Sequence, residues 1–177
     1  MDVKFLNPFL EAAIEVLKAE VGIEAKRGAL SLQQTAMTTD DVTVLIHLVG
    51  EVYGVVLYGM PTQTGLNFVS KIMGQEFKEF DSLAQSGVAE LGNVISGRAT
   101  IKFSQAGFDA NISPPTIING KGEQISTLNF SRLVVPLKTE VGDMIVHLAL
   151  RESVPGKANK LDDFVQLTVA KTTASGS

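Results

Sequence analysis

The chain has 177 residues, with 15 Lys and Arg against 19 Asp and Glu, which gives a formal net charge of −4. Apolar residues make up 45% of the chain and its mean hydropathy is +0.20, so we expect a folded protein with a buried core. The absence of cysteine excludes disulfides, thiolate nucleophiles and cysteine-ligated metal sites. The acidic balance argues against nucleic acid as a partner.

The first residues carry Asp2, Lys4 and Pro8 and lack the apolar run of a signal peptide. No apolar run in the chain approaches the roughly 20 residues that a membrane helix needs. The longest such run, 42–60, is broken by glycine, glutamate and histidine. We therefore expect a cytoplasmic protein without a membrane partner.

Two long helices are predicted. The first has Asn7 as its N-cap, Pro8 as its first helical residue and Gly22 as its stop. The second long helix begins at Asp81 or Ser82 and runs to about Gln105.

A short helix is predicted between Pro61 and Gly74. Leu66, Val69 and Met73 recur on one of its faces. β-branched residues and turn signals predict strands over the remaining segments, namely 24–37, 42–49, 52–58, 128–137 and 144–150.

The order of elements is helix, strands, two helices, strands. Hairpins connect most of the strands, so the predicted fold class is α+β, an α/β sandwich-like arrangement. A largely antiparallel sheet should pack against two long helices and one short helix. We assign 1–152 to this domain and 153–177 to a C-terminal appendage of unknown role, in which 164–169 has the pattern of a further strand or an amphipathic arm.

The helix over 82–105 is unusual because it has three interior glycines, and each costs about 1 kcal/mol relative to alanine. Close approach by another backbone would explain them. Helical spacing also places small and polar residues along one stripe, which consists of Ser86, Glu90, Asn93, Gly97, Thr100 and Ser104. The opposite, apolar side consists of Val88, Leu91, Ile95 and Ala99. Arg98 and Lys102 fall near that apolar side, and the pattern does not explain them.

Glu90 and Asn93 lie one turn apart on this stripe. Their small neighbours would let a partner protein approach closely. The alternative is a solvated helix surface that happens to carry both residues, since such pairs are common on exposed helices.

The segment from Ser86 to Gly97, SGVAELGNVISG, resembles the motif of the CheC/CheX chemotaxis phosphatases. That motif reads Ser or Asp, three residues, Glu, two residues, Asn, three residues, Gly. The family also has a proline downstream of the Asn, and Pro114 or Pro115 could correspond to it. The resemblance extends over about 1–152.

The number of motif copies makes the resemblance CheX-like. CheC-type members carry the motif on two helices and CheX-type members on one. Asn7 and Glu11 have the spacing of a second copy, but Ile14 stands where Asn is required and Lys18 where Gly is expected. No second site is therefore predicted.

The resemblance implies a protein phosphatase that hydrolyses the aspartyl phosphate of a CheY-type response regulator and so terminates a chemotaxis or two-component signal. It implies that Asn93 orients the attacking water and that Glu90 docks to the regulator's active-site lysine. Ser86, Gly97 and Thr100 would form the partner-docking face of the helix. The chain itself would bind no metal or cofactor, with Mg²⁺ expected in the partner regulator. The resemblance also implies a homodimer.

Other polar residues are weaker candidates. His47 and His147 fall in predicted strands, where a core or half-buried position is favoured over a role as catalytic base. The pairs at 40–41 and 162–163 are interpreted as solvated aspartates.

Two further functions stay open. In the first alternative, the chain is a catalytically inactive binding or scaffold module for a phosphorylated regulator, as the flagellar-switch relatives are. A small-molecule-binding or purely structural domain is a third possibility, which a deep apolar pocket lined by both histidines would favour.

Overall fold

The computed structural model describes residues 2–126, 131–156 and 166–168. The described helices are α1 (Leu6–Val16), α2 (Thr62–Met73) and α3 (Ser82–Gln105). A 3₁₀ turn, η1 (Val3–Phe5), precedes α1, and a π-helical turn, η2 (Leu17–Val21), extends it. The strands are β1 (Ala25–Arg27), β2 (Ser31–Gln33), β3 (Met37–Thr38), β4 (Val42–Gly50), β5 (Val52–Met60), β6 (Ala110–Ile112), β7 (Thr116–Asn119), β8 (Gln124–Ser126), β9 (Arg132–Thr139), β10 (Gly142–Glu152) and β11 (Gln166–Thr168).

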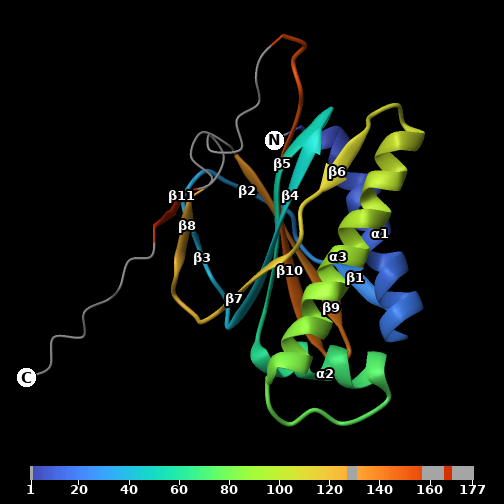
Figure 1. Ribbon diagram of the computed structural model, residues 1–177, viewed down its shortest axis with the longest axis vertical. Coiled ribbons are helices and arrows are strands. Elements are labelled where there is room, and N and C mark those ends of the chain that lie inside the picture. The colour runs from blue at the N-terminus through green and yellow to red at the C-terminus, as the bar shows by residue number, and fades with distance from the viewer. Residues whose placement is uncertain (1, 127–130, 157–165, 169–177) are drawn as a thin grey trace, which may run out of the picture.

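The main sheet is antiparallel and has the strand order β1-β9-β10-β5-β4-β6, with β2 also paired to β9 and β7 to β4. The three helices lie on one face of this sheet, and a small sheet of β11, β8 and β3 lies on the other side (Figure 1). The predicted α+β class, with a largely antiparallel sheet and two long helices and one short one, is confirmed.

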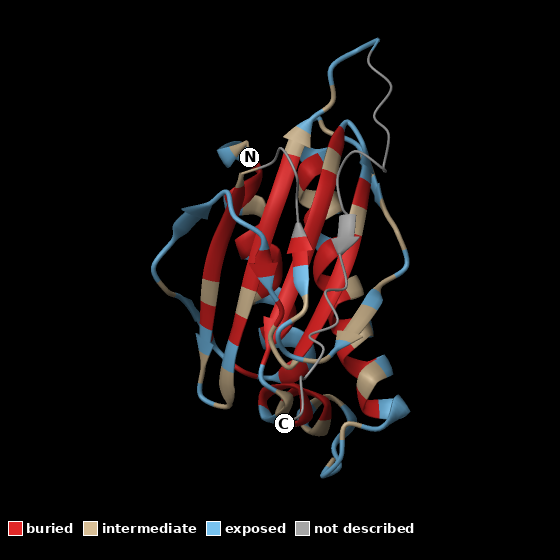
Figure 2. Ribbon diagram, turned by 90° about the vertical axis from the view of Figure 1, so that its left-hand side faces the viewer, coloured by how far each residue is buried: buried red, intermediate tan, exposed pale blue. Residues whose placement is uncertain are grey.

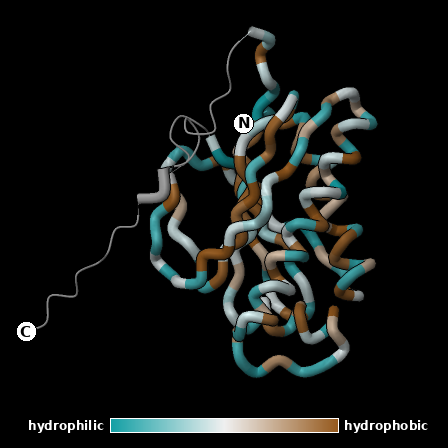
Figure 3. Tube along the Cα trace, viewed as in Figure 1, coloured by the Kyte–Doolittle hydropathy of each residue, from teal (hydrophilic) through white to brown (hydrophobic). Residues whose placement is uncertain are grey.

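Both faces of the central strands are buried (Figure 2). Val44 and Ile46 of β4 face the helices, whereas Leu45 packs with Met37 and Ile125 of the small sheet. A strand covered on both sides is apolar at nearly every position. This agrees with the many hydrophobic positions along the central strands in Figure 3.

Close pairing of two central strands requires a glycine at position 54. Gly54 has φ +139°, and a Cβ there would lie 1.9 Å from the carbonyl oxygen of Ala149 on β10. No other residue type can occupy such a position without moving the strands apart.

The predicted start of the first helix is wrong. Asn7 is exposed and lies inside α1, which begins at Leu6. The Asp2 side chain instead accepts from the backbone N–H of Lys4 and begins η1, so that Phe5 is carried into the core. The predicted stop at Gly22 is confirmed, since Gly22 adopts the left-handed conformation.

Part of the predicted appendage is described. β11 pairs antiparallel with β8, with Leu167 opposite Ile125, which confirms a strand within 164–169. The rest of 157–177, including the aspartates at 162–163, lies outside the described residues, as does the 128–130 portion of the predicted strand 128–137. The remainder of that strand is observed as β9.

In the part of the chain that the structure describes, no helix is long and apolar enough to cross a bilayer.

Candidate functional site on helix α3

Helix α3 is firmly fixed on the sheet. The Asp81 carboxylate accepts from the backbone N–H of Ala84 at 2.8 Å and caps its N-terminus. At mid-helix, the hydroxyl of buried Ser96 shares a 2.7 Å hydrogen bond with the Tyr58 hydroxyl of β5. Burial raises the pKa of the Tyr58 phenol well above its usual range, so this group stays neutral. These anchors fix which face of α3 is turned away from the sheet.

The two sides of α3 are as predicted from its periodicity. The apolar side is buried, at Val88, Leu91, Ile95 and Ala99. The residues of the polar stripe are all exposed or half-buried: Ser86, Glu90, Asn93, Gly97, Thr100 and Ser104.

Glu90 is exposed and Asn93 is half-buried on this stripe. Among the described residues, neither side chain has a hydrogen-bond or ion-pair partner. Thr100, by contrast, donates its hydroxyl to the Gly97 carbonyl of its own helix at 2.7 Å. The carboxylate and the amide are therefore both available to a ligand from outside.

The glycines of α3 serve different purposes, and the predicted approach of a second backbone is wrong for Gly87 and Gly92. A Cβ on Gly87 would lie 3.0 Å from a methyl of Val69 on α2, and one on Gly92 would lie 3.0 Å from a methyl of Val44 on β4. The missing Cβ at each of these two glycines thus leaves space for a valine side chain of the neighbouring element. At Gly97 the nearest atom is the Cδ1 of Ile112 at 3.9 Å, so intramolecular packing leaves room for a methyl group there.

Arg98 and Lys102, which the pattern did not explain, bind the neighbouring helix α1. Lys102 Nζ lies 2.8 Å from a carboxylate oxygen of Glu15 and 3.5 Å from one of Glu11, and Arg98 lies 3.6 Å from Glu15. Hydrogen bonding to Glu15 is the main cause of the raised pKa of Lys102. Glu11 is therefore engaged in helix pairing, and together with the Ile14 and Lys18 mismatches this leaves a single motif copy.

The two prolines lie in the connection between β6 and β7, and both of these strands contact α3. Ser113, just before Pro114, is bound to β4, because its hydroxyl accepts from the backbone N–H of His47 at 3.0 Å and its own N–H donates to the His47 carbonyl at 2.9 Å. The proline segment is thus held at the edge of the sheet, and it follows Ile112, whose Cδ1 would lie 3.9 Å from a Cβ on Gly97.

A small groove borders the motif, and the sequence did not predict it. It has a volume of about 200 Å³, and α2, α3 and η2 all contribute to it. Its lining is mostly apolar, with a carboxylate from each of two elements: Glu20, Ile72, Met73, Ser86, Gly87, Glu90, Leu91 and Val94. Met73 is 39% exposed, because it is the last residue of α2 and lies at the helix end.

The histidines are not part of the stripe. His147 is buried, and its Nδ1 accepts from the Nε–H of Arg132 at 3.2 Å. Arg132 also donates to the Thr35 carbonyl at 2.7 Å and to the Gln33 side chain at 2.9 Å. His47 is half-buried, with a pKa lowered by burial. The interpretation of both as core or half-buried histidines is confirmed.

The pair at 40–41 is not a solvated turn as predicted. Asp41 accepts from the backbone N–H of Thr62 at 3.1 Å and so caps α2. Asp40 packs against Gly59, and burial, with a further contribution from Asp41, raises the pKa of its carboxyl group. Both side chains are half-buried because α2 begins directly above them.

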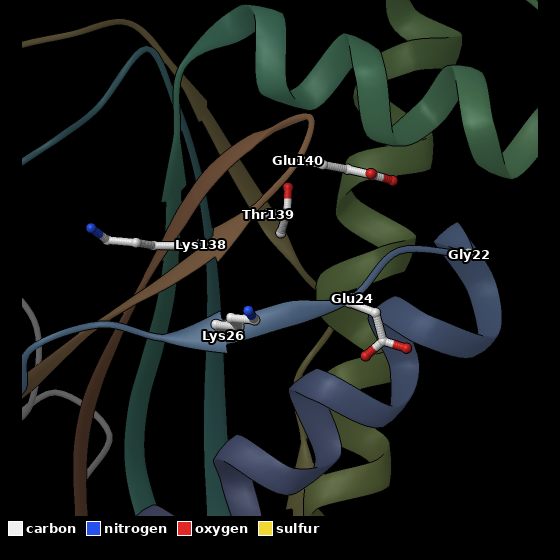
Figure 4. Close-up of a pocket in the computed structure, with 6 residues that line it drawn as sticks. All are labelled: Gly22, Glu24, Lys26, Lys138, Thr139 and Glu140. Atoms are coloured by element: carbon white, nitrogen blue, oxygen red, sulfur yellow. The ribbon is translucent and has the colours of Figure 1, made fainter.

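A larger depression of about 430 Å³ lies at the β1–β9 edge, lined by Gly22, Glu24, Lys26, Lys138, Thr139 and Glu140. In Figure 4 its charged side chains point in different directions and do not converge on a common point. It shares no lining residue with the groove beside Glu90. The α3 stripe is therefore the better candidate site.

This α+β fold carries a Glu-x2-Asn pair on a glycine-bearing helix, without a partner in the part of the chain that the structure describes, and it has clear relatives. The family model described as "Chemotaxis phosphatase CheX" matches residues 42–138, which includes the whole motif, and the chain belongs to this family. The CheY-P phosphatase CheX of Thermotoga maritima is 28% identical over 153 residues, covering 85% of this chain and 98% of that protein.

Solved structures agree with this assignment. A CheC-like superfamily protein from Shewanella sp. PV-4 has a TM-score of 0.77 at 25% identity, covering 85% of this chain and 99% of that one. CheX in the CheX–CheY–BeF3–Mg complex from Borrelia burgdorferi has a TM-score of 0.66 at 28% identity, covering 85% of this chain and 100% of that one.

Proposed function

We propose that this protein hydrolyses the aspartyl phosphate of a CheY-type response regulator and thereby ends a chemotaxis or two-component signal. The observation that carries the proposal is the position of Glu90 and Asn93, one turn apart on the outer face of α3 with no partner among the described residues. Two relatives support the choice of substrate, since one is named a CheY-P phosphatase and the other was solved with CheY.

Asn93 would position the attacking water. Hydrolysis of an acyl phosphate passes through a loose transition state and depends mainly on an in-line nucleophile and on charge stabilisation. An amide oxygen accepts a hydrogen bond from water and the amide N–H₂ donates one, so Asn93 can orient a water without acting as a base. The half-buried position of its side chain restricts the rotamers available to it.

Glu90 would pair with the regulator's active-site lysine. A carboxylate accepts a charge-assisted hydrogen bond from an ammonium group, and Glu90 has no competing cation in the described part of the chain. Because Glu90 and Asn93 share one rigid helix, an ion pair at Glu90 would place Asn93 over the phosphoryl group. Ser86, Gly97 and Thr100 would keep the helix surface low enough for close docking.

The remaining expectations follow from this role. The chain supplies no metal to the reaction, and the Mg²⁺ belongs to the phosphorylated regulator that is the substrate. We expect the protein to work in the cytoplasm, where response regulators act, and as a homodimer.

The deciding experiment follows acyl-phosphate decay on purified CheY-type regulators with Mg²⁺ and catalytic amounts of this protein. Asn93→Ala should lower the accelerated rate by roughly 100-fold or more, because the water loses its positioning group. Asn7→Ala, the same change at an exposed site on α1, should have no effect. Circular dichroism should show both variants folded.

Two results would contradict the proposal. One is full activity in folded Asn93→Ala. The other is stoichiometric binding of the phosphorylated regulator without turnover, which would identify the inactive binding module instead.

A further inference from the structure

We propose that the groove beside Glu90 is a specificity pocket that receives one apolar side chain of the phosphorylated regulator, next to the lysine that Glu90 binds. This inference rests on the proposed function and adds a determinant of partner choice to it. The groove shares Ser86 and Glu90 with the motif stripe, so a partner that covers the stripe also covers the groove.

The size of the groove favours a protein side chain. Its volume of about 200 Å³ is below the roughly 300 Å³ at which small-molecule sites begin. Gly87 deepens it, because a Cβ at that position would lie 3.5 Å from the Met73 methyl and 3.0 Å from Val69. Ile72, Leu91 and Val94 supply apolar walls, and the flexible thioether of Met73 adapts to different occupants.

The charges at its rim point to a partner surface that combines apolar and basic groups. Glu20 from η2 and Glu90 from α3 both line the groove, and its described lining contains neither Lys nor Arg. Neither carboxylate has an ion-pair partner in the described part of the chain. The π-helical turn brings Glu20 to this rim, and such turns are frequent at functional sites. Two unpaired carboxylates beside an apolar floor complement an apolar side chain that neighbours a lysine.

The test measures steady-state dephosphorylation over a range of regulator concentrations. Met73→Ala should raise KM about fivefold with kcat changed less than about twofold, since apolar contact is lost in docking and the chemistry is untouched. Met73→Leu should restore KM to within about twofold of the original value. Leu32→Ala is the matched control, because Leu32 is a 60% exposed apolar residue on β2, outside both the groove and the α3 stripe.

A second pair of variants tests the charge. Glu20→Gln should raise KM about threefold at low ionic strength, and the effect should vanish in roughly 0.5 M salt. Glu24→Gln makes the same change on a carboxylate that already pairs with Lys18 at 3.1 Å, and it should leave KM unchanged.

Titration of each variant with the regulator activated by beryllofluoride and Mg²⁺ separates the two proposals, because it needs no turnover. Weaker binding by Met73→Ala supports the groove even if no variant turns over. The groove proposal is overturned if folded Met73→Ala and Glu20→Gln both match the unchanged protein in KM and in binding. If Asn93→Ala is inactive in that case, the proposed function still stands.

Discussion

The contact between Arg132 and His147 shows how burial and a neighbouring positive charge keep a histidine neutral. The guanidinium of Arg132 is 0% exposed and is held by two oxygen acceptors and the imidazole Nδ1. Burial, and then the adjacent positive charge, lower the pKa of His147 to about 3. His147 is therefore neutral at physiological pH, which lets its Nδ1 accept from the arginine.

This pKa predicts how stability depends on pH. In the unfolded chain a histidine takes up its proton near pH 6.5, whereas the folded chain resists protonation of His147 until about pH 3. The unfolded state therefore binds more protons between these values, and stability is lost as the pH falls through this window. The contribution of His147 between pH 7.5 and 5 should be about 2 kcal/mol. Urea unfolding at both pH values measures it.

His147→Asn is the control for this prediction, since the amide oxygen still accepts from Arg132 but does not titrate. The variant should lose about 2 kcal/mol less than the unchanged protein over the same pH interval. An equal loss in both proteins would show that His147 is not the source.

At the scale of the element, α3 combines structural and docking requirements along one helix. Gly87 and Gly92 are needed for packing against α2 and β4, whereas the structure leaves room at Gly97. Arg98 and Lys102 bind Glu15 of α1, so the cations that interrupt the apolar side also fix the pairing of the two helices. Exposed ion pairs of this kind contribute less than about 1 kcal/mol each, so they serve orientation more than stability.

Replacing each glycine by alanine separates these requirements. Gly97→Ala should stabilise the fold by up to about 1 kcal/mol, because alanine is the better helix former and the methyl group meets nothing closer than 3.9 Å. It should nevertheless raise KM several-fold, because it thickens the docking face. Urea unfolding and phosphatase kinetics measure the two effects.

Gly92→Ala should act in the opposite way. Its methyl group would meet Val44 and Tyr58 in the core, and the free energy of unfolding should fall by about 1 kcal/mol, with the kinetics of the folded protein unchanged.

If Gly97→Ala leaves KM unaltered, the assignment of Gly97 to the docking face is wrong.

At the scale of the whole molecule, the main sheet separates the candidate site from the small second sheet. Helices α1, α2 and α3 cover one face and carry the candidate site, whereas β3, β8 and β11 lie on the opposite side (Figure 1). Met37 of β3 and Ile125 of β8 belong to a second apolar cluster on that side. The candidate site and the C-terminal strand thus lie on opposite sides of the sheet.

This arrangement predicts the effect of removing 157–177. The shortened chain should keep kcat and KM within about twofold, because β11 contacts β8 and lies away from α3. It should lose about 1 kcal/mol of stability with the short β8–β11 ladder. Kinetics and urea unfolding on both lengths test this. A tenfold loss of activity would show that the appendage takes part in the site, contrary to the proposed boundary at residue 152.

Local physics determined much of this protein from sequence alone. β-branched runs and a turn signal placed the hairpin of β4 and β5, and a cap and a glycine stop placed the full span of α3, because these signals act within a few residues. The same 3.6-residue period put Glu90 and Asn93 on one face. The start of α1 was missed because burial of Phe5 favoured an earlier cap than Asn7.

Only the tertiary structure decided the features in which distant segments meet. Lys102 pairs with Glu15 across 87 residues of sequence, and the groove joins Glu20, Met73 and Glu90 from three elements. Asp41 caps a helix 21 residues away. Such contacts depend on how helices and strands pack in register on the sheet. No local period or propensity encodes that register.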